Sequence, residues 1–133
     1  MIYISLPADP YQAKMTNRAA QEKSEKFAIR IVNLYRYLCN EKKEFVLSKQ
    51  ILRSGTSIGA NIAESECAIS KNDFSAKLYI ALKESAETMY WLRLLRSTDL
   101  IGQKAFDSLY SDCEEIKRIL QSSTKTLNRE MKK

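Results

Sequence analysis

The stretch RSGTSIGANIAES, residues 53–65, decides how the chain is interpreted, because it carries two glycines between two strongly helical segments. At 100° per residue, Ile51, Ile58 and Ile62 align as a core stripe. Gly55 and Gly59 lie beside it, four residues apart. This spacing removes bulk and lets a neighbouring helix approach, and close packing must offset the roughly 1 kcal/mol that each mid-helix glycine costs. The pattern GxxxxGK[ST] is absent, so we predict a closely packed helix and not a phosphate loop.

The composition outside this stretch is typical of amphipathic helices. The chain has 133 residues, of which 29% are charged, with only three glycines and two prolines. Both prolines, Pro7 and Pro10, lie in the first ten residues, so nothing after them forbids a helix. The length suits one domain with a hydrophobic core. The sequence therefore predicts an all-α fold.

Apolar periodicity predicts four helices. The first spans about residues 17–42 and ends at the charged run EKKE, and the second spans about 46–68. The third runs to about residue 96 and begins at SKNDF, where Ser70 and Asp73 form a variant of the capping box. The fourth runs from about residue 103 into the C-terminal end. Short polar loops favour an antiparallel up-down-up-down four-helix bundle over residues 17–133, with residues 1–16 as an N-terminal extension.

A line of polar residues borders the core stripe of the second helix: Gln50, Arg53, Ser57, Asn61 and Glu64. It fits a solvated face, a hydrogen-bonded ladder that fixes helix register or a subunit contact, or a ligand site. The third helix offers Glu84 and Glu87 as partners. We hypothesise that Arg53 and Asn61 pair with Glu84 or Glu87, within one subunit or across a subunit boundary. If such a charged set is buried, removing one member costs ~3–5 kcal/mol.

The residue inventory argues against an enzyme. The chain has no histidine, which removes the commonest general base and metal ligand. Glu64, Glu84 and Glu87 suggest a carboxylate-bridged metal pair, but such sites in bundles use Glu-x-x-His motifs, which are absent here. We expect no catalytic residue, no cofactor and no metal.

Cysteine use and hydropathy indicate a cytoplasmic protein. The three cysteines, Cys39, Cys67 and Cys113, are widely spaced on helical stretches, so we expect small reduced core residues. The N-terminus lacks the features of a signal peptide, and no segment approaches 18 continuous apolar residues. We therefore expect no membrane association.

Positive charge gathers at the C-terminal end. The net charge is +6, and residues 117–133 hold six basic side chains against Glu130 alone. The six are Lys117, Arg118, Lys125, Arg129, Lys132 and Lys133. Such an end attracts nucleic acid or an acidic partner, although a solvated helix end has the same composition.

The run from Gln50 to Leu95 closely resembles a small bacterial family of four helix bundle proteins, also known as 23S rRNA intervening-sequence proteins. The resemblance rests on RSGTSIGANIAE, the S-x-x-DF opening of the third helix and IALKE-x-x-ET-x-YWL, and it extends more weakly from about residue 27 to 120. It implies an antiparallel bundle assembled into a homopentamer, with no established enzymatic activity. The family is in turn similar to the accessory variability protein of diversity-generating retroelements, a pentamer that binds nucleic acid and a reverse transcriptase.

Together these observations favour a non-enzymatic oligomeric helical bundle that binds RNA or another nucleic acid through basic surfaces. A protein–protein interaction scaffold with no nucleic-acid role is the alternative.

Overall fold

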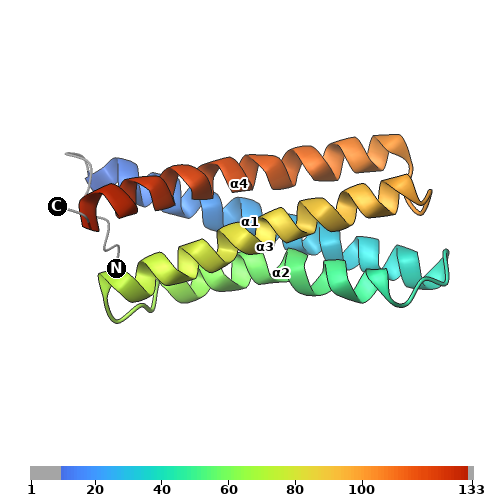
Figure 1. The fold of residues 1–133 in the computed structure, drawn as a ribbon, viewed down its shortest axis with the longest axis horizontal. Helices are drawn as coiled ribbons and strands as arrows, with labels where there is room; N and C mark the ends of the chain where they lie inside the picture. The colour runs from blue at the N-terminus through green and yellow to red at the C-terminus, as the bar shows by residue number, and fades with distance from the viewer. Residues whose placement is uncertain (1–9, 132–133) are drawn as a thin grey trace.

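The computed structural model describes residues 10–131, with side chains from 18 to 130, and contains four α-helices and no strand over that range. They are α1 (Pro10–Asn40), α2 (Leu47–Ser65), α3 (Lys71–Ser97) and α4 (Gln103–Met131). Helices adjacent in sequence contact each other and α1 contacts α4, whereas the diagonal pairs make no contact within these residues. In Figure 1 the α2–α3 connection lies at one end of the molecule and the other two connections lie at the opposite end. The all-α prediction is confirmed, and the contacts fit a bundle.

α1 begins at Pro10, whereas the sequence predicted a start near residue 17. Proline is tolerated in the first turn of a helix, because its missing N–H would have no intrahelical partner there. No glycine or proline follows until Gly55. Residues 10–16 of the predicted N-terminal extension therefore belong to α1, and residues 1–9 lie outside the described residues.

Glu44 holds the start of α2. Its carboxylate accepts hydrogen bonds from the backbone N–H groups of Val46 at 3.1 Å, Leu47 at 2.7 Å and Ser48 at 2.9 Å. Partial burial acts to raise the pKa of Glu44, but the three N–H donors outweigh it and lower that pKa below its ordinary value. In the sequence, Glu44 stands in the charged run EKKE, which predicted only the end of the first helix.

α3 begins as predicted. The Ser70 side chain accepts a hydrogen bond from the Asp73 N–H at 3.0 Å, and the Asp73 carboxylate reaches back to the Ile69 N–H at 3.1 Å. Two backbone donors at the helix start are satisfied in this way. The second bond reaches one residue further back than in a standard capping box.

The glycines of α2 lie against α1. A Cβ atom at Gly55 would come within 2.8 Å of Ile31 Cγ1 and Cγ2, and one at Gly59 would come within 3.2 Å of Ser24 Oγ. Gly55 and Ile31 are both fully buried or nearly so. The stretch that opened the sequence analysis is thus a helix, and its first glycine admits a branched side chain of the neighbouring helix.

The apolar faces of α1 and α4 form the core together with those of α2 and α3. Buried residues on the faces of α1 and α4 are Phe27, Ile31, Leu34, Leu38, Leu109, Cys113, Ile116, Leu120 and Leu127. At the edge of the α1–α4 contact, Arg30 pairs with Asp112 at 2.5 Å and donates to Ser108 Oγ at 2.9 Å. Lys23 pairs with Glu115 at 2.6 Å across the same two helices. Polar contacts therefore border the α1–α4 packing.

The prediction of three core cysteines is wrong for Cys67. Cys113 is buried and Cys39 is half-buried, but Cys67 is exposed. α2 ends at Ser65, and the N–H groups of Glu66 and Cys67 then bond to Ala63 and Glu64 in a tight turn. This turn follows the helix three residues earlier than predicted, so Cys67 is carried outward.

Candidate functional site

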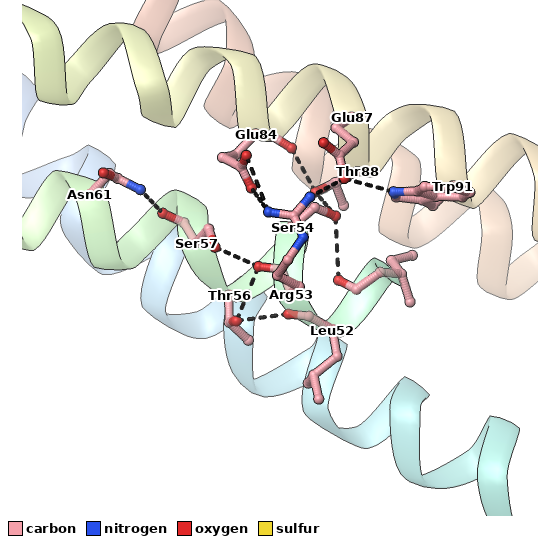
Figure 2. A network of polar contacts seen from close by, with 11 residues as sticks. Leu52, Arg53, Ser54, Thr56, Ser57, Asn61, Glu84, Glu87, Thr88 and Trp91 are labelled. Carbon is pink, nitrogen blue, oxygen red and sulfur yellow. Dashed lines mark hydrogen bonds and ion pairs between the residues drawn. The ribbon is translucent and has the colours of Figure 1, made fainter. Parts of the chain in front are cut away.

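A charged group bridges α2 and α3 at the surface. Figure 2 shows Arg53 reaching from α2 toward Glu84 and Glu87 of α3. Arg53 Nη1 lies 3.1 Å from Glu84 Oε2, and Nη2 pairs with Glu87 Oε2. The Trp91 indole N–H donates to the same Glu87 oxygen at 3.0 Å. One guanidinium therefore forms ion pairs with two carboxylates that lie one helical turn apart on α3.

Burial differs between the partners in this group. The Arg53 side chain is 52% exposed, whereas that of Glu84 is 15% exposed. The Trp91 hydrogen bond lowers the pKa of Glu87, and the Arg53 contact lowers it further, against an opposing effect of burial. The bond to Glu87 also raises the pKa of Arg53, so this side chain stays cationic. The group is an ion-pair network at the surface of a single chain.

Hydroxyl groups join the same two helices beneath this network. Thr88 Oγ1 lies 2.9 Å from Ser54 Oγ and 2.7 Å from the backbone carbonyl oxygen of Glu84. Both side chains are buried. Because a buried hydroxyl needs a partner, this pair specifies which residues of α2 and α3 face each other.

Ser57, Asn61 and Glu64 of the predicted line bond elsewhere. Ser57 donates to the Arg53 carbonyl at 2.6 Å, and Asn61 donates to the Ser57 carbonyl at 2.8 Å. Pairing across a subunit boundary stays a prediction, but within one chain Asn61 bonds to no glutamate of α3. Its short side chain is satisfied one turn back along its own helix. Glu64 pairs with Lys77 at 3.1 Å.

The carboxylates do not gather into a metal site. Within the part of the chain that the structure describes, no three Cys, Asp or Glu residues converge in a way that could hold an ion. Arg53 engages both Glu84 and Glu87, so those oxygens already bind a cation. The ion pairs of Arg53 with Glu84 and Glu87 connect α2 to α3.

The basic residues of α4 spread over two faces. Arg118 is exposed and pairs with Glu114 at 3.3 Å, one turn earlier on the same helix. Lys125 and Arg129 are exposed, while Lys117 is half-buried. Lys132 and Lys133 lie outside the described residues. The structure thus places Arg118, Lys125 and Arg129 on one outward stripe and turns Lys117 aside.

Residues 16–122 match the family of 23S rRNA-intervening sequence proteins. The chain belongs to the 23S rRNA-intervening sequence protein family. It is also similar to the crystal structure of a protein of unknown function from the S23 ribosomal protein family of Bacteroides thetaiotaomicron. The two chains are 55% identical with a TM-score of 0.82, and the match covers 83% of this chain and 98% of that one. The chain has no match among curated proteins.

The family match includes the Arg53 network and ends before the last cations of the outward stripe. Arg53, Glu84 and Glu87 fall inside residues 16–122, whereas Lys125 and Arg129 fall outside. In this member of the 23S rRNA-intervening sequence protein family, the cationic stripe that begins at Arg118 therefore extends past the residues of the family match.

None of the helices in the described range is both long and apolar enough to cross a lipid bilayer.

Proposed function

We propose that this protein is a non-enzymatic, self-associating helical bundle of the cytoplasm that binds RNA or another nucleic acid through the C-terminal half of α4. One observation carries the proposal: residues 117–129 contain four basic side chains and no acidic one. Three of them, Arg118, Lys125 and Arg129, lie exposed on one stripe of the helix. A row of cations contacts successive phosphates without reading base sequence.

The absence of catalytic activity is supported by what the reactive side chains do. The full sequence contains no histidine. Burial raises the pKa of the Cys113 thiol to about 12, so it stays protonated and is a poor nucleophile near neutral pH. The glutamates most suggestive of acid–base chemistry are paired with Arg53. These residues stabilise the fold.

Self-association is supported by the outward face of α3. Ile80 and Tyr90 are 42% and 48% exposed there, although α3 already packs against α2 and α4. A helix with apolar residues on its outer side as well suits burial on more than one side. We expect the subunits to form a homopentamer, as the resemblance implies, and the helices of each subunit to run up, down, up and down. We also expect the relation to the accessory variability protein that the resemblance implies.

Salt-dependent RNA binding tests the nucleic-acid role. For single strands, log K falls against log salt with a slope of about −0.7 per phosphate neutralised. Fluorescence anisotropy between 50 and 200 mM salt should show the wild-type protein losing affinity, and Lys125→Glu/Arg129→Glu should weaken binding and flatten the slope by about 1.4. The matched control is Arg36→Glu/Lys49→Glu, which changes net charge equally at exposed sites of α1 and α2. Equal effects of both pairs, or salt-independent affinity, would refute the proposal.

A protein–protein interaction scaffold is a second candidate, favoured by the loop between α1 and α2. Phe45 and Val46 are adjacent in the connection between α1 and α2, and they are 53% and 71% exposed. Large exposed apolar side chains in adjacent positions often mark a contact surface. Capture of one defined protein that survives nuclease treatment and is lost in Phe45→Ser/Val46→Ser would support it.

A further inference from the structure

An open groove of about 580 Å³ runs between α3 and the basic half of α4. Tyr79 lines it from α3, and Arg118, Gln121, Lys125 and Asn128 line it from α4. The groove therefore combines two cations, an aromatic ring and two side-chain amides. Arg118 and Lys125 belong to the basic C-terminal end of the sequence, and the fold adds Tyr79 to them from a different helix.

The two cations in the groove are available to an anion. Among the described residues Lys125 forms no ion pair, and Arg118 has only Glu114, in a pair whose side chains are 65% and 47% exposed. Exposed pairs of this kind contribute little to stability, so a phosphate can replace the carboxylate. The two cations are seven positions apart in the sequence, which places them two turns, about 11 Å, apart along α4. The cationic wall therefore offers two phosphate contacts in a row.

Tyr79 supplies what a purely electrostatic surface lacks. Its side chain is 37% exposed at the groove, so part of the ring is free to contact a ligand. An aromatic ring beside a cationic track binds an unpaired base by stacking, which is worth ~1–3 kcal/mol per base. Bases inside a duplex are already stacked and do not offer that surface.

We propose that this groove binds a single-stranded segment of nucleic acid, with Arg118 and Lys125 on phosphates and the Tyr79 ring stacked on an unpaired base. The inference rests on the proposed function and adds a preference for single strands over duplexes. Gln121 and Asn128 provide hydrogen-bonding groups beside the stacked base. These amides both donate and accept, so they tolerate different bases.

The test compares a labelled 12-nucleotide RNA with its 12-base-pair duplex by fluorescence anisotropy at fixed salt. Tyr79→Leu keeps apolar volume on α3 but removes the ring, and Tyr79→Phe keeps the ring. We expect Tyr79→Leu to weaken single-strand binding by at least about fivefold and duplex binding by less than twofold, with Tyr79→Phe close to wild type. Tyr37→Leu, at an exposed tyrosine of α1, is the matched control and should change neither.

The possible outcomes distinguish failure of the single-strand preference from failure of nucleic-acid binding itself. Equal binding of both RNAs, or single-strand binding that Tyr79→Leu leaves unchanged, overturns the single-strand inference and leaves the proposed function standing. A wild-type protein that binds neither RNA overturns both.

Discussion

Arg53 on α2 and Glu84 on α3 lie 3.1 Å apart, and the carboxylate is the more buried partner. The pair therefore offsets the free-energy cost of desolvating the Glu84 carboxylate, which α3 places at the edge of the core. The guanidinium remains hydrated on its outer side and also binds Glu87. Because the arginine is half exposed, the cost of ~3–5 kcal/mol estimated for a buried set does not apply within one chain.

A double-mutant cycle on this pair measures that difference. We expect Arg53→Ala and Glu84→Ala to couple by about 1 kcal/mol in urea unfolding, because the pair is partly exposed and one carboxylate is shielded. The matched control is Lys77→Ala with Glu64→Ala, whose carboxylate is largely exposed, and whose coupling should be about 0.5 kcal/mol or less. Equal coupling in both cycles would show that shielding of Glu84 contributes nothing.

Acid should weaken the start of α2 through Glu44. The pKa of Glu44 in the folded protein is lowered from its ordinary value of 4.5, so its contribution is complete above that value and is lost as pH falls through the folded pKa. Glu44→Gln should cost about 1 kcal/mol at pH 7 and show a smaller loss of stability below pH 4.5 than wild type. Parallel stability curves for the two proteins in acid would contradict this assignment.

The cysteines should differ in reactivity. Burial raises the pKa of Cys113 to about 12, while Cys67 is exposed on the turn after α2. A maleimide at pH 7.5 should label Cys67 within minutes and leave Cys113 unmodified until the protein is unfolded. Mass mapping of the labelled peptides reads this out, and labelling of Cys113 as fast as Cys67 in the native protein would contradict its burial.

Assembly should depend on the outer face of α3. Ile80→Lys/Tyr90→Lys should lower the molar mass from light scattering toward that of one chain, because both side chains are partly exposed and apolar in the isolated subunit. Helix content by circular dichroism should stay unchanged. Ala76→Lys/Lys83→Ala on the same helix preserves net charge and gauges general disturbance of that surface. A double-lysine variant of unchanged mass would place the subunit contact elsewhere.

Local patterns sufficed to predict the elements of the fold. The apolar spacings of α4 and the Ser70 cap follow from neighbours in sequence, so both could be predicted before the structure was known. The ends of α1 and α2 depend on finer competition: Pro10 starts one helix, and a turn at Glu66 ends the other.

Contacts between distant residues were harder to predict. The helical wheel placed Arg53 and Asn61 on one line, but it does not say that a short amide bonds within its own helix while a long guanidinium reaches the next. Glu44 was missed because a carboxylate in a charged run is usually solvated. A signal for it existed, since an acid three residues before a helix start can cap it. The Tyr79 groove needs α3 beside α4, which no local pattern contains.

The close approach of α1 to α2 at Gly55 is the central claim about the stretch that decides the fold, and alanine substitution tests it directly. A methyl group at Gly55 would come within 2.8 Å of two carbons of the buried Ile31 side chain, whereas one at Gly59 would meet the Ser24 hydroxyl at 3.2 Å, a contact that a shift of a few tenths of an ångström relieves. Overpacking of a core costs ~1–3 kcal/mol, and replacing a mid-helix glycine by alanine gains up to about 1 kcal/mol.

Urea unfolding of Gly55→Ala and Gly59→Ala, at one protein concentration, is the decisive measurement. The structure predicts that Gly55→Ala lowers the free energy of unfolding by about 1–2 kcal/mol, while Gly59→Ala leaves it unchanged or raises it slightly. Equal stabilisation by both substitutions would contradict the account, because it would mean that α1 does not press against α2 at Gly55.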